Sequence, residues 1–431
     1  MKKLYLEFIR GAAAITVLVY HFLELQTLRN HSKHFYFANW GTDAVIIFFI
    51  LSGVVINISQ TNNPKEKGQF LGNRLLRIYP QLVTGLILGL AVLYVTQSEL
   101  PSVGTIAGNF LMISAIKSYM INIVPCIESN SPLWSISYEI VFYLLFALSI
   151  GKYQKKAVVA WFITALCVMP LYYLQIGPDV LKHFVAVLAF SSIWLTGYYV
   201  YQFRNKFYVN KYTALFSAGT LPLISRMHIS SIYYDPAKYL LFAVFAIPFF
   251  RFCLQTRKQG KKINLFYLII PYLPVVYIVF NQPYLTFTSF ALYSILPAVL
   301  MSICFVVDIL KIKAVVINFI NSTGNFLGKY SYSIYICHYP VLFFFAAFVH
   351  NPVLNLLLSV ACIALIAYGL ETYLQPAVVS YFRRPQAAGQ SPVFSFRAWL
   401  KPAFELALVK RIIVSLMTTV VWLLLLPFHN R

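Results

Sequence analysis

Charged residues are scarce in this chain, and acidic residues are the scarcest. Only 11% of its 431 residues are charged, with 12 Asp and Glu against 34 Lys and Arg. A soluble domain carries about a quarter charged residues, so a soluble fold is excluded, and the 60% hydrophobic content indicates a polytopic membrane protein. The formal charge of +22 would suggest nucleic acid in a soluble protein. Here the charges sort by loop, and no nucleic-acid partner is expected.

Several patterns are missing as well. Strict apolar–polar alternation is absent, which favours helices over a barrel. The six cysteines form no Cys-x-x-Cys pair, so we expect neither a disulfide framework nor a metal site. No small-x-small cleavage site follows the first apolar run, which we interpret as an uncleaved span. No internal repeat is evident, which disfavours a transporter built from repeated halves.

Long apolar segments are abundant, and they predict an all-α, polytopic transmembrane helical bundle. We expect ten to twelve spans, because the segment at 212–224 is short for the ~20 residues that a bilayer requires. With the N-terminus in the cytoplasm, 26 Lys and Arg fall on the cytoplasmic side and six on the other, in phase at every turn. The expected spans are 6–25, 42–59, 80–96, 133–150, 157–174, 183–201, 212–224, 237–253, 263–281, 286–307, 330–350 and 353–374.

We predict two parts of the chain. Residues 1–375 form the transmembrane domain. Residues 376–431 form a basic cytoplasmic segment with an apolar helix at 412–427, which lies at the interface or spans the membrane once more.

The first span carries two ionisable residues, Arg10 and His21. At ~100° and ~1.5 Å per residue their spacing places them on nearly the same face, about 16 Å apart. Each costs several kcal/mol in lipid unless it faces protein or water. The alternative is that Arg10 snorkels to the headgroups and His21 is a satisfied core histidine. The pair on one face favours a shared cavity.

Two more clusters carry candidate residues. Arg74 and Arg77, just before the third span, share a helix face and can grip phosphates, or they form a positive collar that binds lipid headgroups. Glu139, one to two turns inside the fourth span, and Asp43, at the start of the second, lie toward the outside with His21. That arrangement suits a base and the carboxylate that orients it, or a structural ion pair.

A further histidine, His338, lies midway along a span among tyrosines, where a packed, hydrogen-bonded role is favoured. By depth, the arginines group toward the cytoplasm and suit a phosphorylated donor. His21 and the carboxylates group toward the outside and suit deprotonation of an acceptor hydroxyl. The sequence therefore predicts group transfer across the membrane.

These residues together resemble the membrane acyltransferase-3 family, integral-membrane O-acyltransferases that modify bacterial surface glycans. Five motifs in order, from about residue 4 to 375, carry the resemblance. They are Arg10 with His21, Phe48–Gly53 preceded by Asp43, Arg74 with Arg77, Leu133–Glu139, and Ser331–Pro340.

The resemblance implies transfer of an acyl group, acetyl being the commonest, from cytoplasmic acyl-CoA to a hydroxyl of a glycan or glycolipid. By position, His21 would be the base or a transient acyl carrier, and Arg10 would order the thioester end of the donor or a nearby carboxylate. Arg74 and Arg77 would bind the CoA phosphates. Glu139 would orient His21 or the acceptor.

Asp43 and His338 are further candidates for contacts with substrate. Expected partners are a glycan or lipid-linked sugar, membrane lipids and other proteins of surface-polysaccharide synthesis, in the cytoplasmic membrane of a bacterium. Some relatives carry a fused extracytoplasmic domain for which this chain has no room, so the membrane body acts alone or with a separate protein. Two other functions stay open: a transporter or flippase for a glycan or lipid intermediate, and a non-catalytic scaffold.

Overall fold

The computed structural model describes residues 2–30, 40–115, 124–206, 208–225, 234–255 and 312–382, with short fragments between 299 and 310. Nine helices in this part are long and apolar enough to cross a membrane, which confirms the predicted helical membrane fold. The expected spans at 263–281 and 286–307 and the apolar segment at 412–427 lie wholly or largely outside the described residues.

The first half of the chain contains five α-helices, one 3₁₀-helix and the only strands in the described ranges, two residues each and paired in parallel. These elements are α1 (Lys2–Asn30), α2 (Trp40–Asn62), α3 (Lys67–Val95), α4 (Val103–Phe110), β1 (Ser114–Ala115), β2 (Val124–Pro125), η1 (Glu128–Leu133) and α5 (Trp134–Ser149).

Helices joined by short turns make up the described ranges of the second half, and they include one π-helical turn, η2. These elements are α6 (Gln154–Cys167), α7 (Met169–Leu174), α8 (Asp179–Gln202), α9 (Lys211–Ser225), α10 (Pro236–Leu254), α14 (Lys313–Phe348), α15 (Pro352–Gly369), η2 (Leu370–Leu374) and α16 (Gln375–Phe382).

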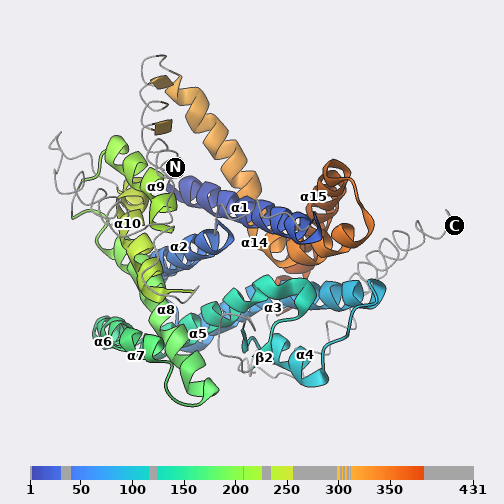
Figure 1. The fold of residues 1–431 in the computed structure, drawn as a ribbon. Coiled ribbons are helices and arrows are strands. Elements are labelled where there is room, and N and C mark those ends of the chain that lie inside the picture. Colours follow the sequence, from blue (N-terminus) through green and yellow to red (C-terminus); the bar gives the residue numbers. More distant parts are fainter. Residues whose placement is uncertain are drawn as a thin grey trace, which may run out of the picture.

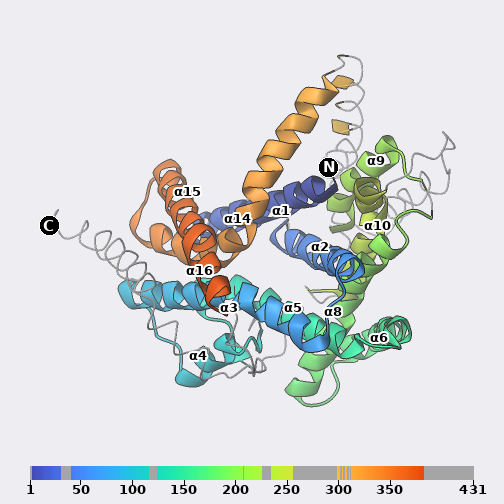
Figure 2. The same ribbon diagram turned by 180° about the vertical axis from the view of Figure 1, so that it is seen from behind.

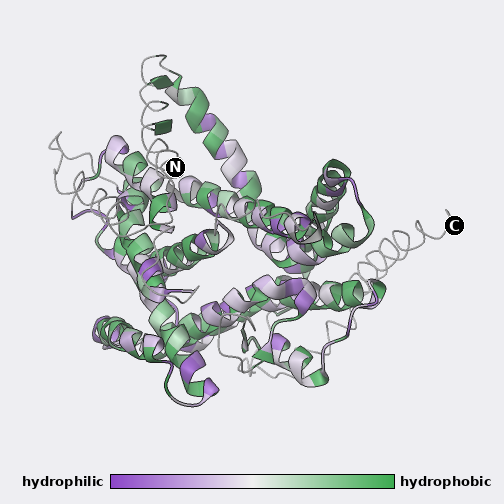
Figure 3. Cartoon of the chain, in the orientation of Figure 1, coloured by the Kyte–Doolittle hydropathy of each residue, from purple (hydrophilic) through white to green (hydrophobic). Residues whose placement is uncertain are grey.

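The helices pack in pairs around a central region. Helix α1 packs along α14, α2 along α8, and α9 along α10, as both views of the ribbon show (Figures 1 and 2). The spans containing α6 and α15 are the least buried, and their ribbons are mostly hydrophobic (Figure 3). Apolar side chains that face outward on such helices are what a hydrocarbon environment requires. These two spans therefore present their surfaces to lipid.

Two expected spans begin earlier than the apolar pattern indicated. The span expected at 80–96 is part of α3, which starts at Lys67, and the span expected at 330–350 is the end of α14, which starts at Lys313. Basic and polar residues lower the hydropathy of residues 67–79 and 313–329, but α3 and α14 continue through these segments. In Figure 1, α14 extends well beyond the neighbouring helices. Helix α9, expected at 212–224, is the short helix that its length suggested.

Glycine allows α2 and α8 to cross with their backbones in contact. A Cβ atom at Gly53 would lie 2.0 Å from the carbonyl oxygen of Trp194, and one at Gly197 would lie 2.1 Å from that of Ile50. Neither oxygen can move without shifting a helix. Small residues at such crossings are a common device of membrane helices, which gain stability from close van der Waals packing.

We expect Gly53→Ala and Gly197→Ala to destabilise the folded protein by about 1–3 kcal/mol or more, because overpacking forces the backbones apart. The measurement is the midpoint of thermal unfolding in detergent. Gly72→Ala is the matched control, because an added Cβ there meets no atom within 4 Å. The control should be neutral or stabilised by about 1 kcal/mol. Equal midpoints for all three variants would contradict the close crossing.

Candidate functional site

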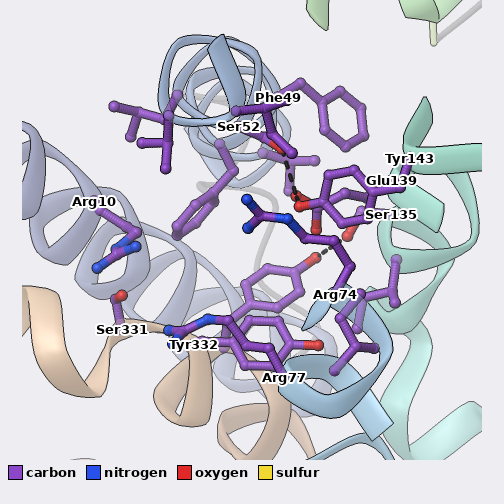
Figure 4. A pocket seen from close by; sticks show the side chains of 18 of the residues that line it. Arg10, Phe49, Ser52, Arg74, Arg77, Ser135, Glu139, Tyr143, Ser331 and Tyr332 are labelled. Carbon is purple, nitrogen blue, oxygen red and sulfur yellow. Dashed lines mark hydrogen bonds between the residues drawn. The ribbon is translucent and has the colours of Figure 1, made fainter. Parts of the chain in front are cut away.

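A cavity lies among α1, α2, α3, α5 and α14 (Figure 4). Its wall combines apolar side chains with three arginines, Arg10, Arg74 and Arg77, and two glutamates, Glu7 and Glu139. The sequence analysis predicted that the three arginines share one region, and the structure brings them together in this cavity. A cavity that gathers charges inside an apolar bundle is the expected place for a polar or anionic ligand.

Arg10 is held on both sides by the protein. It forms an ion pair with Glu7, one turn earlier in α1, and it donates to the carbonyl oxygen of Gly328 on α14 at 3.1 Å. The helices are close here because Gly328 has no side chain: a Cβ atom at that position would lie 2.6 Å from Glu7 Cβ. Arg10 therefore points into protein and not into lipid.

Arg74 and Arg77 lie within α3 and line the cavity. The Arg74 guanidinium lies 5.5 Å from the ring centroids of Phe70 and of Tyr143, and that of Arg77 lies 5.9 Å from the ring of Tyr332. Neither arginine has a carboxylate partner among the residues that the structure describes, and Arg74 Nε is buried without a hydrogen-bond partner there. Two guanidinium groups with free donors have the chemistry to bind an anion.

Glu139 lies deeper than the sequence analysis placed it. Because η1 leads directly into α5, the candidate span is Glu128–Ser149, and Glu139 is near its middle. It lines the cavity with the arginines, whereas His21 is not among the lining residues.

A chain of hydrogen bonds ends on Glu139. The Tyr143 hydroxyl donates to the carboxylate, so it accepts from Ser52, 3.1 Å away, and Ser52 in turn accepts from Trp194 Nε1 at 3.1 Å. Figure 4 shows Ser52 and Tyr143 on the same side of the cavity as Glu139. These donors stabilise a negative charge on Glu139 beside the arginines.

His21 belongs to a second polar cluster. Its Nδ1 lies 2.7 Å from the carboxylate of Glu24, and its ring centroid lies 5.3 Å from that of His338 and 4.9 Å from that of Tyr339. His338 donates from Nδ1 to the carbonyl oxygen of Tyr335 at 2.8 Å, and its buried Nε2 has no hydrogen-bond partner in the described residues. His338 thus offers an unused acceptor.

Tyr335 connects the two clusters. Its side chain lines the cavity, and its ring centroid lies 5.8 Å from that of His338. Its hydroxyl is fixed by Ser135 at 2.6 Å and by the carbonyl oxygen of Pro132 at 2.8 Å. Tyr335 therefore lies between the arginine cavity and the histidine pair and contacts both.

Asp43 is not among the residues that line the arginine cavity. It lies in the first turn of α2 and accepts a hydrogen bond from Ser225 of α9 at 2.8 Å. The neighbouring Gly41 packs against Tyr20, which places Asp43 at the same end of the bundle as His21, as predicted. Its observed contact ties α2 to α9.

Several polar residues that the sequence analysis passed over support these clusters. Glu7 and Glu24 each lie three positions from a residue it singled out, a spacing that predicts contact on a helix. In a third network, Ser333 donates to Gln81 at 2.9 Å, and Gln81 donates to Glu371 of η2 at 2.9 Å. A carboxylate in an apolar span was the available signal for Glu371. Within the described ranges, no group of three His, Cys, Asp or Glu could hold a metal ion.

Comparison with known proteins assigns the chain to a protein family. A family model described as an acyltransferase domain matches residues 3–372. The chain is also 29% identical over 144 residues to a protein of Streptomyces mycarofaciens named acyltransferase MdmB, a match that covers 32% of this chain and 37% of that protein. The chain thus spans little more than a third of that relative's length. No solved structure matches it. Because the family model covers most of the chain and nine described helices can span a membrane, this integral membrane protein belongs to the acyltransferase-3 family.

Proposed function

We propose that this protein is an acyltransferase that moves an acyl group, acetyl in the first instance, from cytoplasmic acyl-CoA to a hydroxyl of a glycan or glycolipid in the cytoplasmic membrane of a bacterium. The observation that carries the proposal is the cavity in which Arg74 and Arg77 face inward with no carboxylate partner among the described residues. Acyl-CoA carries several phosphates, and paired guanidinium groups bind phosphate oxygens strongly.

The thioester end of the donor belongs at the Tyr335 side of the cavity, next to the histidine pair. There His21 Nε2 removes the proton from the acceptor hydroxyl, and the hydroxyl oxygen attacks the thioester carbonyl carbon. The carbon–sulfur bond breaks, and the leaving thiolate takes the proton back from His21. The products are an O-ester and free CoA. General-base catalysis of this kind contributes about 10²–10⁴-fold.

The other candidates take supporting roles. Arg10, fixed by Glu7 and Gly328, adds positive charge near the donor, and the bare Nε2 of His338 can accept a hydrogen bond from an acceptor hydroxyl. Glu139 faces the arginine cavity, so we assign it to the substrate in that cavity and not to the orientation of His21. We leave Asp43 out of the site because Ser225 engages it.

The test is transfer of label from radiolabelled acetyl-CoA to surface glycans in membranes that contain the protein, with export of the same glycans measured in parallel. We expect alkali-labile label on the glycan, which marks an O-ester, and unchanged export when the protein is absent. Loss of export together with intact acylation would show a transporter or flippase instead. Loss of neither would show a scaffold. Mass spectrometry of the labelled glycan then identifies the sugar and the hydroxyl.

A further inference from the structure

The contact between His21 and Glu24 is the shortest polar contact in the second cluster. Glu24 lies three residues after His21 on α1, so both side chains lie on the same face of the helix. The carboxylate oxygen is 2.7 Å from His21 Nδ1. The side chains are 16% and 35% exposed, so the pair is partly shielded from the surroundings. A charge-assisted hydrogen bond in such a position holds a ring more firmly than one on an open surface.

The chemistry of the pair fixes the state of the imidazole. An ionised carboxylate can only accept a hydrogen bond, so Nδ1 of His21 must carry the proton. In the neutral ring, Nε2 then has the free electron pair, which is the form that a general base requires. Without the carboxylate, both tautomers of a neutral imidazole become accessible, and only one of them presents the base at Nε2.

Other groups near His21 do not provide this orientation. His338 uses its Nδ1 to donate to the Tyr335 carbonyl, and its ring packs against that of His21 with centroids 5.3 Å apart. Tyr339 packs edge-on against His21 with a centroid separation of 4.9 Å. Glu139 lines the arginine cavity and accepts from Tyr143. Among the described residues, Glu24 alone provides His21 with a carboxylate partner.

We propose that Glu24 is a positioning residue for the acyl transfer, and this inference rests on the proposed role of His21 as the base. Glu24 holds the Nδ1–H tautomer before the reaction. It then stabilises the imidazolium that forms when Nε2 takes the proton of the acceptor hydroxyl. Glu24 itself stays ionised throughout, and the proton passes from the hydroxyl to His21 and then to the departing thiolate.

The experiment measures kcat and KM for acetyl-CoA with full-length protein in proteoliposomes. We expect Glu24→Gln to lower kcat by about 10²–10³-fold, since it removes the orientation and the charge, with little change in KM. Glu24→Asp keeps a carboxylate and should recover part of the loss. Glu99→Gln is the matched control, because it removes an exposed carboxylate that has no bond to His21 and should leave kcat within about twofold.

A double-mutant cycle with His21→Ala separates positioning from a structural role. If Glu24 acts through His21, Glu24→Gln should cause no further loss in the His21→Ala background. Equal losses in both backgrounds would overturn the inference, and so would a wild-type kcat for Glu24→Gln. Failure of the proposed function would give a different result. His21→Ala would then retain wild-type kcat, so the role of His21 as the base would be wrong, whatever the effect of Glu24→Gln.

Discussion

Replacing Arg74 and Arg77 together by alanine is expected to weaken acyl-CoA binding by about 10²–10⁴-fold, since each hydrogen bond between charged groups contributes roughly 1.5–3 kcal/mol. Both guanidinium groups line the cavity, and their positions over aromatic rings do not consume their hydrogen-bond donors. The alanine variant should keep its fold, because no carboxylate among the described residues is left without its partner. Binding of radiolabelled acetyl-CoA to protein in detergent, measured at several salt concentrations, is the direct test.

The salt dependence of binding and a control variant with two lysines replaced test this prediction further. Binding to the wild-type protein should weaken as salt rises, and the double variant should lose most of that dependence. Lys155→Ala/Lys156→Ala removes the same number of charges from an exposed part of α6 and should bind like wild type. Arg74→Lys/Arg77→Lys keeps the charge without the bidentate geometry and should fall between the two. Equal affinity of wild type and the alanine variant would place the donor elsewhere.

The arginine cavity could be predicted from the sequence because of what a charge costs in lipid. Arg10, Arg74 and Arg77 had few low-energy positions other than a protein interior or the headgroup region. In the structure all three line the cavity inside the helical bundle. The same free-energy cost predicted that His21 faces protein, and its ring packs against those of His338 and Tyr339. The cost of a charged group in hydrocarbon therefore predicts well which residues face the protein interior.

The partners of these residues were harder to predict. Depth along a span was counted from the first apolar residue of the expected span 133–150, whereas the helical span begins earlier, at Glu128. In the structure Glu139 lines the cavity with the arginines, and the carboxylate bonded to His21 is that of Glu24. The contact of Glu24 with His21 could have been predicted, because residues three positions apart on a helix lie on the same face. Contacts between helices, such as Gln81 with Glu371, depend on crossings that one sequence does not specify.

The glycines at helix crossings also show that contacts between helices are hard to predict from one sequence. Gly53 lies in a motif that the sequence analysis singled out, yet nothing in the motif indicated that its neighbour is the backbone at Trp194. A contact across helices requires the partner helix, its register and its crossing angle together. Local pattern therefore predicted which segments are helices, and the three-dimensional structure was needed to find which faces meet.

His21→Ala is expected to lower kcat for acyl transfer by about 10²–10⁴-fold, the range that a positioned general base supplies. KM for acetyl-CoA should change little, because His21 does not line the cavity that holds the arginines. The assay is transfer of label from acetyl-CoA to the glycan acceptor in proteoliposomes. His350→Ala serves as the control, since it removes an exposed imidazole and should retain wild-type turnover.

The same variants decide between the two roles that the resemblance implies for His21. A transient acyl carrier would accumulate label on the protein when acetyl-CoA is supplied without acceptor, and the label would disappear in His21→Ala. A general base would show no such label, because the acyl group passes directly from sulfur to the acceptor oxygen. We expect the second result, since the Nδ1–H bond to Glu24 suits an imidazole that takes a proton at Nε2. Wild-type kcat in His21→Ala would contradict both roles and would direct attention to Glu139, the carboxylate inside the arginine cavity.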